Sequence, residues 1–410
     1  MNRIFFIFWL IAAFLYIYAP LNLFPFNISH VLALCSWLII IFYYVEIFEK
    51  FCKSNMIGAI IILNIFSIIL TFFHSIFDWN RSFMIYQHFF ILFEVLPISF
   101  VLSIIFLKKG GTDGSFLKAI FLLGCFQSVI ALCTFLWPEL RDLLTSKAIV
   151  DLGMEGGQLE VSNFRTYGFA RSYLFSMPLF LGVCAMIGLI LSSEYKWYIF
   201  YSIILLPGIL LNARIGLFGF GLGVVLYVIS IIRKRKFVHS IIFFCSIVFV
   251  SIKLFVFCAE GLFELNPYLG RWLETGFYSI IDSDNSNVAY REMWFVPDTT
   301  YWIYGTGDLP YRSKNGLDSD IGYVQIFHFG GIIYSLFIYL PYIIIFLNLS
   351  SLKINTSIIN LFQLVILLIV GSNLKGNAFY PSEHVLGFIL MVSYFQINVF
   401  FNDFLHSDVI

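Results

Sequence analysis

The chain has 410 residues with 24 acidic and 24 basic side chains, so its formal net charge is zero. Hydrophobic residues make up 60% of it and charged residues 12%, and the mean hydropathy is +0.91. A soluble domain averages roughly 45–50% apolar and 25% charged residues, so this composition excludes a soluble globular protein. The zero net charge also gives no electrostatic reason to expect a nucleic-acid partner.

Long apolar runs predict an all-α polytopic membrane protein. A membrane-spanning helix needs about 20 consecutive apolar residues, whereas a β-barrel would show segments of about ten residues with alternating hydrophobicity. The apolar runs lie at about 4–24, 31–48, 56–77, 83–107, 116–137, 172–192, 197–212, 216–232, 238–258, 322–347, 356–372 and 385–401. They predict about twelve transmembrane helices in a single integral membrane domain, residues 1–410, whose first run is a span and not a signal peptide.

The distribution of cations predicts the orientation of these spans. With the N-terminus in the cytoplasm, the inner segments hold twelve Lys and Arg residues, whereas the short outer loops hold only Arg81, Arg214 and Lys375. Because cations accumulate in short cytoplasmic loops, we expect both termini in the cytoplasm. Two long segments, 138–171 and 259–321, then lie on the outer side of the membrane.

The large late loop, 259–321, is the longest polar interval of the chain. Connections are usually short, so we expect this loop to carry function. Its stretches GLFELNPYLGRWLE and SNVAYREMWFVPDTTYWIY are amphipathic enough to predict short interfacial helices on the membrane surface, with irregular loop as the alternative. Aromatic residues in or near these stretches, such as Trp272, Trp294, Tyr301 and Trp302, are candidates for stacking on sugars.

Arginines on the outer side run against the usual charge bias and therefore need a local reason. Arg165 and Arg171 flank the segment FRTYGFAR before the sixth run. Arg214 lies in NARIGLFGFGLG, and Arg291 lies in YREMW. An arginine at a span end often reaches lipid headgroups, but its planar fork also suits bidentate binding of phosphate. A converging set of these cations would form an anion site that suits a polyprenyl pyrophosphate.

Asp320 and His328 are the candidate proton acceptors. Asp320 directly precedes the run 322–347, where it is either the N-cap of a helix or a base at the membrane surface. His328 lies about two turns into the same run and is either a packing residue or a catalytic one. His384, beside Glu383 at the last outer loop, is a further alternative.

Metal and cofactor chemistry has little support in the sequence. The seven cysteines lie almost entirely inside or beside apolar runs, and no CxxC motif occurs. We therefore expect neither a zinc site nor a disulfide framework. The two Asp-Ser-Asp motifs, Asp282–Asp284 and Asp318–Asp320, are weak signals for a divalent metal. We expect no metal and no cofactor.

Three local patterns resemble the O-antigen polymerase and ligase superfamily. FRTYGFARSYLFSMPLFLGV looks like the family's Arg-x-x-Gly-Phe segment, and NARIGLFGFGLG is similar to its arginine-containing turn. YREMW, IYGTGD and SDIGYVQIFHFGGIIYSLFIYL resemble the family's succession of an arginine, Gly-x-Gly, a polar pair and a glycine-rich helix start. Ligases commonly carry a His-Asn pair where this chain has Asp320-Ile321, so the resemblance favours a Wzy-type polymerase over a ligase.

The resemblance implies a membrane glycosyltransferase of the bacterial inner membrane. Its substrate would be an undecaprenyl-pyrophosphate-linked oligosaccharide, polymerised at the periplasmic face into O-antigen or capsular polysaccharide by inverting transfer without metal. Arg165, Arg171 and Arg214 would bind the pyrophosphate, and Asp320, Arg291 and His328 would act in catalysis. A chain-length regulator and a flippase are the expected protein partners.

Two other functions stay open at this point. Within the same class, the alternative is an O-antigen ligase. From a different class, the alternative is a flippase or transporter of lipid-linked oligosaccharide, which would more naturally show two similar halves and charged residues inside many spans. The polar residues of this chain are instead concentrated in the late outer loop, which favours chemistry at one membrane face.

Overall fold

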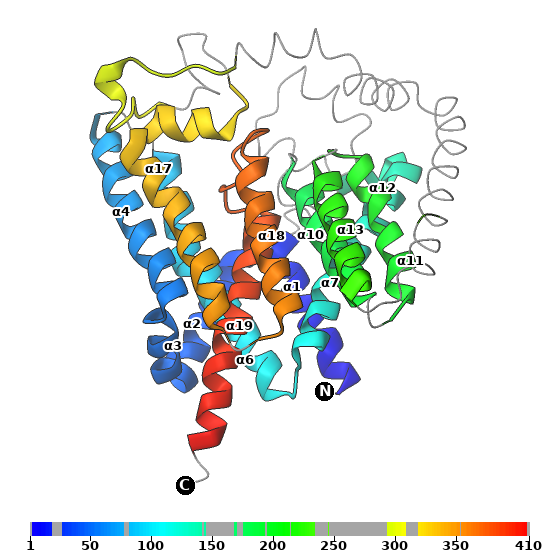
Figure 1. Ribbon diagram of the computed structural model, residues 1–410. Coiled ribbons are helices and arrows are strands. Elements are labelled where there is room, and N and C mark those ends of the chain that lie inside the picture. Colours follow the sequence, from blue (N-terminus) through cyan, green and yellow to red (C-terminus); the bar gives the residue numbers. More distant parts are fainter. Residues whose placement is uncertain are drawn as a thin grey trace, which may run out of the picture. The chain divides into compact units, whose positions relative to one another are not determined.

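Figure 1 shows the computed structural model of the chain. It describes residues 2–18, 27–77, 82–141, 143–144, 168–169, 175–192, 195–213, 215–233, 245, 293–308, 319–352 and 354–407. Within these ranges the regular secondary structure is helical and contains no strand. The observed fold class of the described chain is therefore all-α, as the apolar runs predict.

Several described helices are suited to crossing a membrane. Six helical segments are long and apolar enough: Ile28–Cys52, Asn55–Ile76, Met84–Lys108, Asp113–Leu136, Gly322–Ser351 and Glu383–Phe400. Shorter apolar helices occupy Arg3–Tyr18, Ser176–Leu191, Trp197–Leu210, Gly216–Ser230 and Thr356–Ser372. The protein is thus a multi-pass helical membrane protein. Each expected run overlaps one of these helices, except 238–258, which lies almost entirely outside the described residues. The total of twelve spans stays a prediction.

Contacts divide the chain into two units, and the first contains both ends of the chain, up to Ala119 and from Met293 onward. Its α-helices are α1 (Arg3–Tyr18), α2 (Ile28–Ile39), α3 (Val45–Cys52), α4 (Asn55–Phe77), α5 (Ser82–Phe90), α6 (Leu96–Lys108), the first turns of α7 (Asp113–Leu136), α17 (Gly322–Asn348), α18 (Thr356–Ser372) and α19 (Glu383–Ser407). Short π-helical segments, η1 (Ile40–Tyr44) and η3 (Ile91–Val95), continue α2 into α3 and α5 into α6. Two 3-10 turns, η4 (Thr299–Tyr301) and η6 (Leu349–Ser351), complete the described elements.

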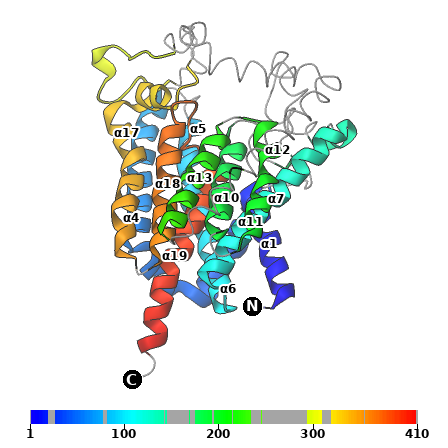
Figure 2. The same ribbon diagram turned by 45° about the vertical axis from the view of Figure 1, so that its right-hand side comes forward.

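Helix α17 packs along α4, and α19 packs against α6 (Figures 1 and 2). Aromatic rings fill part of the interior, and the rings of Phe116 and Tyr394 stack with centroids 3.8 Å apart. The indole of Trp9 donates a hydrogen bond to the carbonyl of Leu102 at 2.8 Å, so this buried polar group is satisfied. In both views α1 begins and α19 ends at one end of this unit, while 293–308 lies at the other.

The second unit contains the rest of α7 with α10 (Ser176–Leu191), α11 (Trp197–Ile203), α12 (Leu205–Leu210) and α13 (Gly216–Arg233). Helix α13 packs closely on α10 because its glycines remove side chains from the contact. A Cβ atom added at Gly219 would lie 2.8 Å from the Cα of Gly182, and one at Gly223 would lie 2.8 Å from the Cα of Met186. The glycine-rich sequence after Arg214 thus serves helix packing.

The end of the large loop differs in part from the expectation. The described part of SNVAYREMWFVPDTTYWIY, from Met293 to Tyr304, contains only the single 3-10 turn η4 and no amphipathic helix. Pro297 has no backbone N–H to donate to a helix. The stretch GLFELNPYLGRWLE lies outside the described residues, so its interfacial helix stays a prediction.

Candidate functional site

A kink in α17 is the centre of the candidate site. Gly331 has φ +64° and ψ −158°, which divides α17 into segments 322–330 and 332–348. Residues with a side chain rarely adopt this backbone conformation, because the Cβ atom would clash. The kink interrupts the hydrogen-bond pattern of the helix, so nearby backbone groups need other partners.

The carbonyls of His328 and Phe329 find these partners in the large loop. In a continuous helix each carbonyl would accept from the amide four residues later. Here the carbonyl of His328 accepts from the amide of Thr306 at 2.8 Å. The carbonyl of Phe329 accepts from the amide of Gly307, also at 2.8 Å.

The amides beyond the kink are satisfied in the same way. Ile332 donates to the carbonyl of Trp302 at 2.8 Å, and Ile333 donates to that of Ile303 at 3.3 Å. Loop and helix therefore supply each other with the backbone partners that both would otherwise lack. An unsatisfied peptide group is costly away from water, so this exchange holds the loop segment on α17.

Glycines allow this close approach. A Cβ atom at Gly305 would collide with the backbone of Phe329, and one at Gly331 would collide with the carbonyls of Trp302 and Ile303. Gly305 and Gly307 also have positive φ angles, +74° and +77°. The Gly-x-Gly motif of the sequence is thus the part of the loop that contacts the kink.

The imidazole of His328 is held at this junction. Its Nδ1 lies 3.0 Å from the backbone carbonyl of Asp308 and 3.0 Å from the Oγ1 of Thr306. Because a carbonyl only accepts, Nδ1 carries the proton. The Thr306 hydroxyl in turn donates to the carbonyl of His328 at 3.0 Å, and the ring of Phe295 packs edge-on with centroids 5.8 Å apart.

The other ring nitrogen of His328, Nε2, has no hydrogen-bond partner among the described residues. The residue as a whole is only 7% exposed. In the neutral tautomer set by Nδ1, Nε2 carries a lone pair. A fixed imidazole with an available Nε2 is the arrangement required of a general base.

Asp320 lies just before the same helix segment. Its side chain is exposed and has no hydrogen-bond partner among the described residues. The N-cap position is occupied by Ile321, so the N-cap alternative for Asp320 is wrong. The neighbouring Ser319 is fully buried, donates to the carbonyl of Met293 at 2.9 Å and accepts from the amide of Ile321 at 3.2 Å.

Two of the predicted site residues are described by the structure: His328 lies on the short first segment of α17, and Asp320 lies two residues before that segment begins. The four predicted arginines lie outside the described residues: Arg165, Arg171, Arg214 and Arg291. Their placement stays a prediction.

His384, the alternative base, has a structural role. Its Nε2 lies 2.6 Å from the carbonyl of Ala378, to which it donates, and its Nδ1 lies 3.3 Å from the hydroxyl of Ser382. His384 as a whole residue is 1% exposed. Both nitrogens are therefore engaged in holding the loop before α19.

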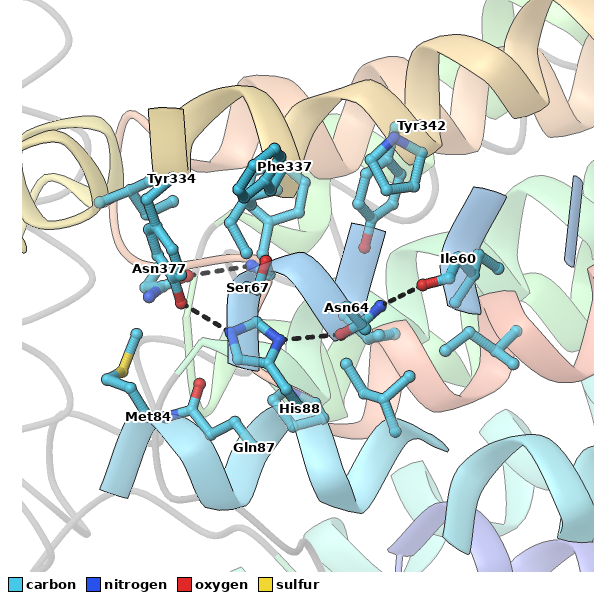
Figure 3. A pocket seen from close by; sticks show the side chains of 18 of the residues that line it. Ile60, Asn64, Ser67, Met84, Gln87, His88, Tyr334, Phe337, Tyr342 and Asn377 are labelled. Carbon is cyan, nitrogen blue, oxygen red and sulfur yellow. Dashed lines mark hydrogen bonds between the residues drawn. The ribbon is translucent and has the colours of Figure 1, made fainter. Parts of the chain in front are cut away.

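A second group of polar residues lies beside a pocket in the first unit (Figure 3). The amide nitrogen of Asn64 donates to the carbonyl of Ile60 at 2.7 Å, so its oxygen faces Nδ1 of His88 at 2.8 Å. The hydroxyl of Tyr334 lies 2.9 Å from Nε2 of His88. A neutral His88 that donates from Nδ1 and accepts at Nε2 satisfies all these contacts.

Sequence reasoning missed this network. Asn64, His88 and Tyr334 are not among the candidate site residues predicted from the sequence. A signal was present, because polar side chains inside apolar spans are costly and tend to face the protein interior. Asn64 and His88 lie inside the runs 56–77 and 83–107.

Comparison of the chain with models of known families, with curated proteins and with solved structures gives no match. The functional assignment therefore rests on the residues and their geometry.

Proposed function

We propose that the protein is a membrane glycosyltransferase that polymerises undecaprenyl-pyrophosphate-linked oligosaccharide repeat units in O-antigen or capsular polysaccharide synthesis. The observation that carries the proposal is the arrangement of His328, whose Nδ1 bonds the carbonyl of Asp308 while Nε2 has no partner among the described residues. The resemblance of the surrounding segments to O-antigen polymerases supplies the class of substrate.

His328 acts as the base in this proposal. Its Nε2 takes the proton of a sugar hydroxyl on the acceptor while that oxygen forms a bond to the anomeric carbon of the donor glycan. The bond from this carbon to the pyrophosphate oxygen breaks, and its electrons leave with undecaprenyl pyrophosphate. Attack opposite the leaving group inverts the anomeric configuration. General-base catalysis of this kind contributes about 10²–10⁴-fold in rate.

Asp320 and the arginines supply the charged groups of the proposed reaction. We assign the exposed carboxylate of Asp320 to orienting the acceptor hydroxyl. Arg291 precedes Met293, whose carbonyl bonds Ser319 next to Asp320. We assign Arg291 to the developing charge on the leaving group, and Arg165, Arg171 and Arg214 to binding of the pyrophosphate. No metal is required, because the pyrophosphate is already a good leaving group.

The location follows from the same proposal. The protein lies in the bacterial inner membrane with both termini in the cytoplasm and the loop 259–321 in the periplasm. The opposite placement of 293–308 and the two terminal helices within the first unit supports this orientation (Figure 2). Exposed rings of Trp294, Tyr301 and Trp302 offer stacking surfaces for sugars. A flippase would deliver the substrate and a chain-length regulator would set polymer size.

The decisive experiment is a deletion strain whose surface polysaccharide is separated on a gel. If the protein is a polymerase, the deletion strain carries only a single repeat unit on the final acceptor. The wild-type gene on a plasmid then restores the ladder of longer chains. Complete absence of transfer would instead indicate the ligase alternative. Accumulation of the lipid-linked unit in the cytoplasmic leaflet would indicate the flippase alternative, and a normal ladder would refute all three.

Complementation with Asp320→Asn and His328→Gln then separates the two candidate bases. Loss of the ladder with His328→Gln and a shortened ladder with Asp320→Asn agree with the proposed roles. A normal ladder with His328→Gln, and none with Asp320→Asn, would make the carboxylate the base.

A further inference from the structure

The pocket in Figure 3 contains a polar group that the rest of the fold does not use. Gln87, on α5, lines this pocket and is 6% exposed as a residue. Its amide has no hydrogen-bond partner among the described residues. An amide without a partner is costly when it is closed off from water, so the position of this amide at the cavity surface indicates that a ligand or solvent in the cavity completes its hydrogen bonds.

A second amide faces the same space. Asn377 lines the pocket from the loop before α19, and its oxygen accepts from the amide of Phe379 at 3.1 Å. This bond fixes the side chain, and its NH₂ group has no partner among the described residues. Gln87 offers one acceptor and a donor group, and Asn377 adds a donor group. Hydroxyl groups, which both donate and accept, complement this set.

The lack of charged groups among the described residues that line the pocket excludes anions and cations as its ligands. Among the described residues that line it, none carries a carboxylate, ammonium or guanidinium group. The one titratable ring, His88, is held between Asn64 and Tyr334 in a way that the neutral form satisfies. A phosphate bound here would have no positive partner and would lose its hydration without compensation.

The size of the pocket limits how much of a ligand enters. Its volume is about 50 Å³. At about 10–15 Å³ for each water-sized group, it accepts about three to five such groups. That is enough for the hydroxyl-bearing edge of a ring or a glycerol unit, with the remainder at the mouth. The rings of Phe337 and Tyr342 provide apolar walls for the C–H faces of such a group.

We infer that this pocket is a binding site for an uncharged, hydroxyl-bearing group, recognised by the amides of Gln87 and Asn377. The site is distinct from the kink at Gly331 and does not rest on the proposed polymerase activity. Two sources present this chemistry at a membrane: a sugar ring of a glycan, and the glycerol headgroup of phosphatidylglycerol. Each of these two groups carries vicinal hydroxyls, which would reach the two amides while its carbon atoms face the apolar walls of the pocket.

Photolabelling of the full-length protein in nanodiscs tests the inference. The probe is a methyl hexopyranoside that carries a diazirine, and the labelled peptides are located by mass spectrometry. The discs contain phosphatidylethanolamine either alone or with phosphatidylglycerol. Labelling of α5 and of the loop 373–382 is expected, with competition by excess methyl hexopyranoside and not by inorganic pyrophosphate. Suppression of labelling only in discs with phosphatidylglycerol would identify the lipid as the source of the hydroxyls.

Matched variants decide whether the amides are responsible. Gln87→Leu keeps the approximate volume and removes the amide, and should lower labelling by about tenfold or more. Asn377→Asp keeps the oxygen that holds Phe379 and removes the donor, and should also lower labelling. Ser75→Ala is the control and should leave labelling at the wild-type level, because the Ser75 hydroxyl lies outside the pocket lining and donates to the carbonyl of Thr71 in its own helix at 2.9 Å.

Three results would overturn the inference. The first is equal labelling of wild type and Gln87→Leu in discs where both proteins keep the same melting temperature. The second is competition by pyrophosphate in place of the saccharide, and the third is no labelling above that of empty discs. Polysaccharide gels of the same variants are scored separately, so a failed polymerase assignment leaves the binding result readable.

Discussion

Nδ1 of His328 donates a hydrogen bond to the backbone carbonyl of Asp308, 3.0 Å away and on the loop that packs against the kink of α17. This contact fixes both the tautomer and the direction of the ring. It joins a residue of an apolar helix to the polar loop before that helix, so the candidate base is oriented by the segment that faces the substrate in the proposed mechanism.

Removal of the imidazole should abolish polymer formation. We expect His328→Gln to lower transfer by at least about 100-fold, because the proton acceptor is lost. Thr306→Val removes the hydroxyl that bonds the ring and should cost on the order of tenfold, since one hydrogen bond no longer positions the base. Rates are measured with purified protein and lipid-linked repeat units. Thr300→Val, an exposed threonine in η4, is the matched control and should retain the wild-type rate.

The outer arginines should be necessary for the reaction and not for insertion. Arg291→Ala and Arg214→Ala are expected to abolish long-chain polysaccharide, because the leaving pyrophosphate loses its cationic partners. Membrane fractionation should show normal amounts of both variants. Arg312→Ala, a loop arginine with no assigned role, serves for comparison and should leave the ladder intact. Normal ladders in both Arg291→Ala and Arg214→Ala would remove the anion-site hypothesis.

The kink should depend on glycine at one position. Gly331→Ala places a Cβ atom against the carbonyls of Trp302 and Ile303 at a positive φ, and we expect a loss of stability of about 1–3 kcal/mol or more. Thermal unfolding in nanodiscs measures it. Gly371→Ala, an exposed position of α18 with open space around it, should be neutral or slightly stabilising. Equal melting temperatures for the two variants would contradict the strained geometry.

The bond between His88 and Tyr334 should be measurable as a coupling energy. Tyr334→Phe removes the hydroxyl that lies 2.9 Å from His88. In a double-mutant cycle with His88→Phe we expect a coupling of about 0.6 kcal/mol, and at most about 1.7 kcal/mol, as is usual for hydrogen bonds between transmembrane helices. Unfolding in bicelles by detergent provides the free energies. Additive effects of the two substitutions would mean that the contact does not stabilise the fold.

Replacement of Gly219 on α13 by a larger residue should disrupt the close packing of α10 on α13. Gly219→Leu has no space beside Gly182 and should lower the melting temperature or the yield of folded protein. Gly221→Leu, on the same helix but with nothing within 4 Å of its added Cβ atom, is the control and should be tolerated. A similar loss in both variants would point to the glycine content of the helix and not to the contact.

The fold class and the approximate helix positions follow from the sequence because apolar length is a local property. The Gly305–Gly307 motif and the pair Gly330-Gly331 were also visible, and they prove to be two sides of one contact. The sequence could not show that contact, since the backbone bonds between Thr306 and His328 depend on how the chain returns to the helix.

The pocket network was harder to predict for a similar reason. His88 and Tyr334 are 246 residues apart, and nothing local to either position indicates the other. The expected N-cap alternative for Asp320 fails because the chain enters α17 at Ile321, where buried Ser319 already bonds the incoming amide. Side-chain pairings across distant helices need the packed structure, whereas the helices themselves do not.

The shared backbone bonds at the kink also limit how a substrate enters. Withdrawal of residues 302–307 from α17 would expose four peptide hydrogen bonds together, at a cost of several kcal/mol. This part of the loop therefore forms a stationary rim. Any opening that admits a bulky lipid-linked glycan must therefore move parts of the chain outside residues 302–307. Substitutions that speed up substrate entry should be sought in those parts and not among the glycines of the rim.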